Sequence, residues 1–177
     1  MTTPADLIGT YIRAKDENRP HLMAGAFAAD ALLTMDVRTD AISFPSQASG
    51  RDAISRVLVQ DFAKTYENVY TFCLTEPPQR IATDFSCDWL VGMSVKADGA
   101  VRVGCGRYDW RFEPDPPNLV SELRITIEAM QMLPAAALEV VMPWLSSMPY
   151  PWCDAERMRA AMPEIEALAT VRRYLSR

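Results

Sequence analysis

The sequence predicts one α+β domain, because segments with a helical period come first and long alternating segments follow them. This order differs from the repeated strand–helix–strand order of parallel α/β folds. The chain has 177 residues, of which 49% are hydrophobic and 23% are charged. That composition is typical of a soluble globular protein, and the length is sufficient for one sizeable core.

Three helices are predicted before the main run of strands. Residues 6–18 place apolar side chains, Tyr11 among them, on one broad face. Pro20 suits the first turn of a second, short helix that ends at Asp30. The third helix covers residues 51–66 and repeats apolar side chains at helical spacing.

Strands are predicted where apolar and polar residues alternate. Near the N-terminus, Leu33 and Met35 point to one side of such a strand and Asp36 points to the other. In a later strand the apolar phase changes at Gly104-Cys105-Gly106, which predicts a glycine-flanked bulge. The run of strands is expected to form an antiparallel meander. The predicted strands cover residues 31–38, 69–75, 85–96, 101–113 and 119–132.

The character of the sequence changes after Met132. Eight of the thirteen prolines and six of the ten methionines lie from Pro114 onward. We therefore divide the chain into a domain of residues 1–133 and a helical extension of residues 134–177, packed on the same domain. The extension is too small to fold alone. Whether it covers a pocket or enlarges a dimer interface stays open at this stage.

Charge and composition argue against several classes of function. The net charge is −5 with the signs interspersed, so no basic stripe is present for nucleic-acid phosphates. No leader-like start or membrane-length apolar run is visible, so we expect no membrane partner and a cytoplasmic location. The chain has a single histidine, His21, and four cysteines without a Cys-x-x-Cys pair. These predict buried reduced thiols, no metal site and no organic cofactor.

Three stretches resemble the SnoaL-like group of the nuclear-transport-factor-2-like superfamily. They are Tyr11-Ile-Arg-Ala-Lys-Asp16, then Phe27-Ala-Ala-Asp-Ala31 with Gly50-Arg-Asp-Ala-Ile54, and finally Gly106-Arg-Tyr-Asp-Trp-Arg-Phe112. The resemblance implies a cystatin-like cone, in which a curved antiparallel sheet wraps around the N-terminal helices and encloses an apolar cavity. It also implies a dimer through the outer face of the sheet. Relatives include ketosteroid isomerases, polyketide cyclases and scytalone-dehydratase-like enzymes, so the fold alone does not decide the function.

The resemblance assigns expectations to single positions. Tyr11 is similar to the oxyanion-hole tyrosine of ketosteroid isomerases. Their general-base aspartate falls on Met35, beside Asp36, and their second acid falls on Tyr108.

Two aspartates are candidate bases for proton abstraction beside a carbonyl, which also needs a donor for the oxyanion. Asp36 would serve with Tyr11 and Tyr108 if its strand turned it inward, whereas strict alternation points it outward. Asp61 lies on the apolar stripe of the third predicted helix, and the alternative is a position at the stripe edge in contact with water.

The expected pocket wall is apolar and aromatic. Met35, Trp89, Trp110 and Phe112 would line it, or the aromatic residues would serve only as core. Three functions remain open: a cofactor-free isomerase, dehydratase or cyclase acting on a small apolar carbonyl compound; a binding module for a small apolar or aromatic molecule; and a structural partner of another protein. A homodimer through the outer sheet face is expected.

Overall fold

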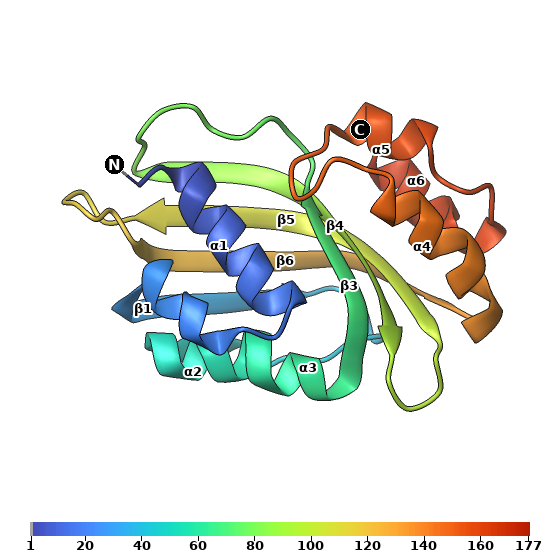
Figure 1. Cartoon of the computed structure of the whole chain (residues 1–177), viewed down its shortest axis with the longest axis horizontal. Coiled ribbons are helices and arrows are strands. Elements are labelled where there is room, and N and C mark those ends of the chain that lie inside the picture. Colours follow the sequence, from blue (N-terminus) through green and yellow to red (C-terminus); the bar gives the residue numbers. More distant parts are fainter. Residues whose placement is uncertain (1) are drawn as a thin grey trace.

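The computed structural model describes residues 2–177 and shows a six-stranded sheet with helices gathered at its two ends (Figure 1). Helix α1 (Pro4–Asp16) begins at a capping box, in which the side chains of Thr3 and Asp6 each accept a hydrogen bond from the other residue's backbone N–H. A 3-10 helix (Pro20–Gly25) follows. The third predicted helix is one continuous run of α2 (Arg51–Ser55), a π-helical segment (Arg56–Asp61) and α3 (Phe62–Thr65).

The sheet is mixed, which corrects the prediction of a purely antiparallel one. Strands β3 to β6 form the predicted antiparallel meander, but β1 pairs in parallel with β6. The helical run between β2 and β3 carries the chain to the opposite edge of the sheet, so the meander reaches β1 from that edge and β6 is not joined to β1 by a hairpin. In spatial order the strands are β2 (Gln47–Ser49), β1 (Phe27–Val37), β6 (Val120–Leu133), β5 (Val101–Phe112), β4 (Asp84–Val95) and β3 (Tyr66–Cys73).

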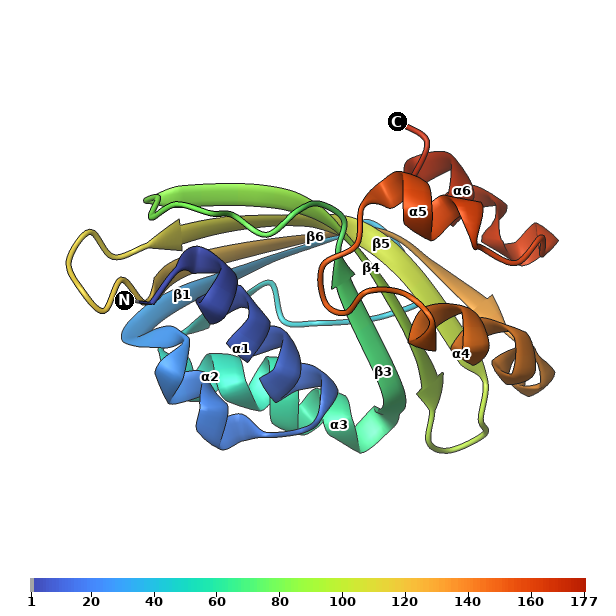
Figure 2. The ribbon, with the colours of Figure 1, turned by 45° about the horizontal axis from the view of Figure 1, so that its top comes forward.

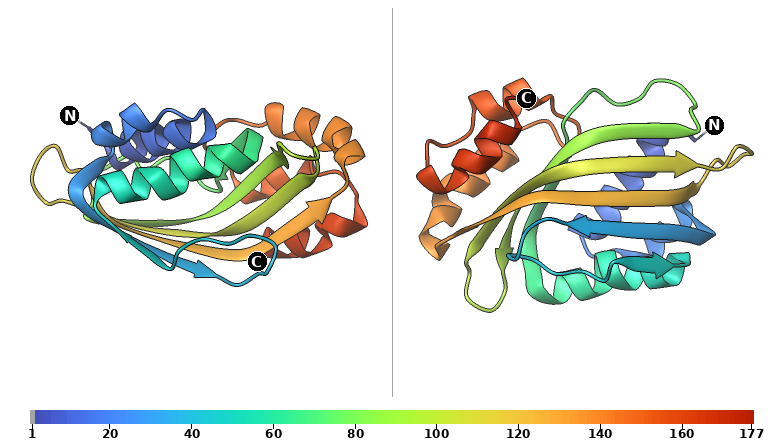
Figure 3. Two further views of the ribbon diagram at one scale, coloured as in Figure 1. Left: turned by 90° about the horizontal axis from the view of Figure 1, so that it is seen from below. Right: turned by 180° about the vertical axis from the view of Figure 1, so that it is seen from behind.

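The sheet is strongly bent, and α1 to α3 lie in its hollow (Figure 3, left). The face that these helices cover is called the inner face here, and the other the outer face. Along β1 the burial alternates as the sequence predicts, with Leu33 and Met35 buried on the inner face. The predicted curved α+β cone is therefore confirmed.

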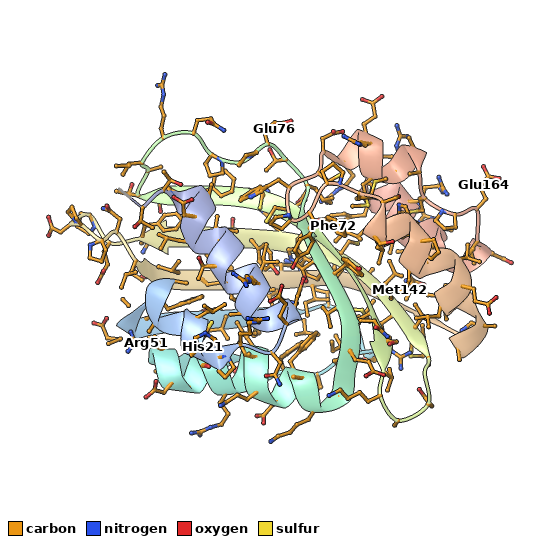
Figure 4. All side chains as sticks on the ribbon, in the orientation of Figure 1. His21, Arg51, Phe72, Glu76, Met142 and Glu164 are labelled. Carbon is orange, nitrogen blue, oxygen red and sulfur yellow. The ribbon has the colours of Figure 1, made fainter. Side chains whose placement is uncertain are left out.

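The C-terminal extension packs on the outer face at the far end of the strands. Its helices are α4 (Leu138–Ser146), α5 (Ala155–Ala160) and α6 (Ala169–Tyr174), and Figure 2 shows them at the end opposite to α1 and α2. A second apolar cluster joins the extension to the sheet. Phe72, labelled in Figure 4, belongs to this cluster together with Leu90, Val101, Val103, Val141, Trp144, Leu145, Met158 and Val171.

The change of apolar phase in β5 has another cause than the predicted bulge. Strands β4 and β5 pair without any register shift, so β5 alternates along its whole length. Its odd-numbered residues all face outward: Val101 and Val103 lie under the extension, whereas Arg107 and Asp109 lie beyond it. The extra residues are in β6, where the register against β5 skips Ser121 and Glu128.

At Gly92 on β4 the extension packs tightly on the sheet. A Cβ atom at this position would overlap with the side chain of Leu145 from α4. The extension therefore covers part of the outer face and lies on the other side of the sheet from the hollow that holds α1 to α3. In the part of the chain that is described, no helix is long and apolar enough to cross a membrane.

Candidate functional site

A small cavity lies in the inner apolar cluster, between the helices and the inner face of the sheet. Its volume is about 40 Å³, which is room for about three water molecules or for a ligand group of a few atoms. Three methionines, Met35, Met93 and Met130, form part of its wall. Because methionine side chains are unbranched and adaptable, this wall can reshape around a larger group.

The polar groups on the cavity wall come from α1 and from the inner face of the sheet. They are the side chains of Tyr11, Lys15, Thr71 and Tyr108, together with the indole N–H of Trp89. Burial raises the pKa of Tyr11 and of Tyr108 well above the ordinary value, so both phenols stay protonated and able to donate at neutral pH.

Several buried donors in this region have no acceptor. The hydroxyl of Tyr11 and the indole N–H groups of Trp89 and Trp110 find no hydrogen-bond partner among residues 2–177. Tyr11 and Trp89 line the cavity, whereas Trp110 packs edge-on against Tyr11 with ring centroids 5.4 Å apart. Buried donors are normally paired, so unpaired ones mark a place where an acceptor would be stabilised.

A buried ion pair closes one side of the cavity. Lys15 Nζ donates to Asp16 Oδ1 at 2.8 Å and to Thr71 Oγ1 at 2.7 Å, and it lies 4.6 Å from the centre of the Phe62 ring. The side chains of Lys15 and Asp16 are only 8% and 2% exposed. The pair forms because the last turn of α1 packs against β3, which carries Thr71 on the inner face.

Asp16 accepts four hydrogen bonds and is thereby saturated. Besides the bond from Lys15, its carboxylate accepts from the backbone N–H of Thr71 at 2.7 Å and from the Thr71 hydroxyl at 2.8 Å. The fourth donor is the hydroxyl of Tyr150 at 2.8 Å, which comes from the extension. The contact with Asp16 adds to burial in raising the pKa of Tyr150.

Two surface hollows adjoin the cavity, and Phe62 borders all three spaces. One hollow of about 250 Å³ shares Ile42, Phe44 and Phe62 with the cavity wall. The other, of about 210 Å³, shares Lys15 and Phe62. Phe62 is therefore the residue that lies between the cavity and both surface hollows.

Of the two predicted bases, neither lines the cavity. Asp36 points to the outer face and pairs with Arg38, Oδ2 to Nη2 2.8 Å, and it is 40% exposed. The strand does not turn it inward, because alternation is maintained through Met35. Asp61 is 53% exposed and pairs with Lys64 at 2.9 Å, in the hollow on the solvent side of Phe62.

The predicted wall residues divide into two groups. Met35 and Trp89 line the cavity, as do the predicted donors Tyr11 and Tyr108. Trp110 and Phe112 are instead buried core residues of the inner cluster, away from the cavity wall. The predicted site included neither Lys15 nor Asp16. The spacing of α1 carried a signal for Lys15, because it follows Tyr11 by four residues and so shares its face.

The remaining candidates are away from the cavity. His21, labelled in Figure 4, is exposed on the short 3-10 helix. The four cysteines are buried free thiols. Burial raises the pKa of Cys105 to about 12. Residues 2–177 contain no group of three or more histidine, cysteine, aspartate or glutamate side chains placed to hold a metal ion.

Solved structures similar to this one include proteins of nuclear-transport-factor-2-like and of ketosteroid-isomerase-like fold. A member of that superfamily from Salmonella enterica is 15% identical, with a TM-score of 0.56 over 71% of this chain and 88% of the other. A protein of ketosteroid-isomerase-like fold from Catenulispora acidiphila, in complex with trimethylamine, is 18% identical, with a TM-score of 0.54 over 70% of this chain and 85% of the other.

A hexachlorocyclohexane dehydrochlorinase is 14% identical, with a TM-score of 0.54 over 72% of this chain and 84% of the other. No protein-family model matches the sequence, and no curated protein matches it either. These likenesses confirm the nuclear-transport-factor-2-like fold expected from the sequence, and at this level of identity they concern the fold alone.

Proposed function

We propose that this chain binds a small, mostly apolar carbonyl compound in the central cavity. The observation that carries the proposal is the mismatch in its wall: buried donors of Tyr11 and Trp89 have no acceptor among the described residues, and the surroundings are apolar. A ligand oxygen would supply the acceptor, while the rest of the ligand would contact methionine and aliphatic side chains.

Binding is favoured over acid–base catalysis because none of residues 2–177 places a free carboxylate on the cavity wall. Asp36 and Asp61 lie outside the cavity, and Asp16 is occupied by four donors. A cofactor-free isomerase, dehydratase or cyclase on this fold would need a base within hydrogen-bond or one-water reach of its substrate. The donors could still polarise a carbonyl, so proton exchange belongs in the test.

The test is an NMR titration of the labelled protein with 3-methyl-2-butanone and with acetophenone. Saturable shifts of residues around the cavity are expected, and Tyr11→Phe should weaken binding by about 3- to 10-fold, the value of one hydrogen bond. Tyr70→Phe, on the other side of the sheet, is the matched control. Shifts that map to the outer face, or no saturation, would contradict the proposal. Deuterium exchange at the carbon beside the carbonyl, faster than in buffer alone, would indicate that the protein is an enzyme and not only a binder.

Two finer expectations complete the proposal. A homodimer would use the part of the outer face that the extension leaves open (Figure 3, right). On this part Arg111 pairs with Asp84 and Glu122 around a hollow of about 390 Å³. Sedimentation at several concentrations tests it, and a monomer throughout would exclude it. The four free thiols fit a reducing compartment such as the cytoplasm.

A further inference from the structure

We infer that Asp16 makes the cavity selective for a neutral carbonyl compound over the corresponding carboxylate, by neutralising the ammonium group of Lys15. The inference rests on the proposed function and names the class of ligand within it. Asp16 is neither one of the two candidate bases nor part of the predicted aromatic wall.

The charges beside the cavity belong to one ion pair. Lys15 is the cationic side chain among those that line it, and Asp16 Oδ1 lies 2.8 Å from its Nζ. All four groups that contact the Asp16 carboxylate are donors, which is the arrangement of an ionised carboxylate, since this form only accepts. The local sum of charge is therefore zero.

A neutral ligand and an anionic ligand would meet this ion pair differently. A carboxylate would bring a negative charge next to Asp16 in an apolar surrounding, and the ammonium group of Lys15 on the cavity wall is already paired. An uncompensated buried charge is strongly disfavoured. A neutral carbonyl adds no charge and still accepts from the donors that have no partner. Lys15 also keeps one N–H beyond the two given to Asp16 and Thr71.

Tyr150 makes the extension part of this arrangement. The segment that follows it is fixed to the edge of β3, because Cys73 N donates to Pro151 O at 2.7 Å and Cys153 N donates to Cys73 O at 3.0 Å. The Tyr150 ring packs edge-on against Phe72 at 5.7 Å between centroids. Its hydroxyl therefore reaches Asp16 from a fixed position and donates to the carboxylate there.

The experiment compares two probes of nearly identical shape, 3-methyl-2-butanone and isobutyrate, by NMR titration at neutral pH and constant ionic strength. The wild-type protein should bind the ketone at least about 10-fold more tightly than the carboxylate. In Asp16→Asn, Lys15 becomes an uncompensated cation, so the affinity for isobutyrate should rise at least about 10-fold, with little change for the ketone. Asp30→Asn makes the same change at an exposed position of β1 and should alter neither affinity.

Each outcome decides. Equal binding of the two probes in the wild-type cavity overturns the selectivity while the binding function stands. An equal gain for isobutyrate in Asp16→Asn and Asp30→Asn also overturns it, because the effect would then come from net charge. If neither probe binds, the proposed function itself falls. Should Asp16→Asn not fold, Asp16→Ser also leaves Lys15 without its carboxylate and takes its place in the comparison, and an unchanged affinity for isobutyrate in that variant would overturn the inference.

Discussion

The two faces of the same strands bury apolar side chains in different ways. On the outer face, the indole N–H of Trp144 is buried in the cluster under the extension and donates to Met158 O at 3.2 Å. On the inner face, the hydroxyl of Tyr11 and the indole of Trp89 have no acceptor within residues 2–177, and a cavity adjoins them. The buried indole of the outer cluster is therefore hydrogen-bonded, whereas the buried donors beside the cavity of the inner cluster are not.

This difference separates a structural face from a functional one. An unpaired buried donor costs about 1–3 kcal/mol, so a protein that keeps several beside a cavity gives up stability there. The outer cluster, in which the extension covers the strands, supplies stability in compensation. Changes on the outer face should therefore affect folding alone, and changes on the inner face should also affect the ligand.

The largest effect is expected for Gly106→Ala on the inner face. A Cβ at this position would overlap with the carbonyl oxygen of Thr126, which belongs to the backbone of β6 and cannot move aside. We expect a loss of about 3 kcal/mol or more in the free energy of unfolding, measured by urea denaturation. Gly9→Ala in α1 has open space and should stabilise by about 0.5–1 kcal/mol. Similar values for both variants would contradict the close approach at Gly106.

Leu145→Ala tests the outer cluster. Leu145 is fully buried between α4 and the sheet, and removing its side chain should cost about 2–5 kcal/mol. Gly92→Ala alone should also destabilise, because its Cβ would overlap with Leu145. In the Leu145→Ala background that penalty should largely disappear, which a double-mutant cycle measures. Additive losses would mean that the extension does not dock at Gly92.

Alkaline pH should weaken the inner face. Burial raises the pKa of Tyr11 and of Tyr108, so the folded state favours the neutral phenols. The associated stability is complete below the ordinary pKa of about 10 and is lost as the pH rises through the raised values. Urea unfolding should show a decline above about pH 10, with a slope of up to about 1.4 kcal/mol per pH unit for each tyrosine. Tyr11→Phe should reduce this slope, and an unchanged slope would assign it to other groups.

Tyr150→Phe breaks the link between the two faces at a single hydroxyl. Asp16 would lose one of its four donors, and because Tyr150 is partly exposed we expect a loss of about 1 kcal/mol in thermal or urea unfolding. Tyr70→Phe removes a hydroxyl from the neighbouring ring, 6.0 Å away between centroids, without touching Asp16. It should leave the stability within about 0.5 kcal/mol of the wild type. A larger loss of stability in Tyr70→Phe than in Tyr150→Phe would refute the role of the contact between Tyr150 and Asp16.

The smallest effects are expected at the two aspartates that the sequence favoured as bases. Asp36→Asn and Asp61→Asn each remove one member of an exposed ion pair, which contributes about 0–1 kcal/mol. Ketone binding should change less than about 2-fold in both. A loss of 10-fold or more in either variant would restore that aspartate as part of the site.

Much of the fold could be read from local patterns. The helical period of α1, the alternation of β1 and the run of long strands are properties of neighbouring residues, and each predicted the correct element. The phase change in β5 was misread, because its cause is not local. Both faces of that strand are buried at its first half, and only the docking of the extension, some forty residues later in the chain, explains this.

The site was readable in part for the same reason. The helical period of α1 and the alternation of the strands predict that Tyr11 and Tyr108 point inward and that Asp36 points outward, as the structure shows. Asp16 follows the last apolar residues of α1, and nothing in its neighbours indicates that Thr71 and Tyr150 converge on it. Such convergence depends on how α1, β3 and the extension pack, which a single sequence does not encode in any short pattern.

The parallel pairing of β1 with β6 also has a consequence for synthesis. Phe27 pairs with Val120 and Val37 with Ile127, so β1 waits for a partner that leaves the ribosome long after it. Non-local pairing of this kind forms late, because the entropy of closing a long loop must be lost before any contact between the two strands stabilises it. During translation the nascent chain therefore carries an apolar strand edge, beside which only the short β2 can pair. Chaperone binding to stalled nascent chains should be strongest before residue 133 emerges and should fall once β6 is complete.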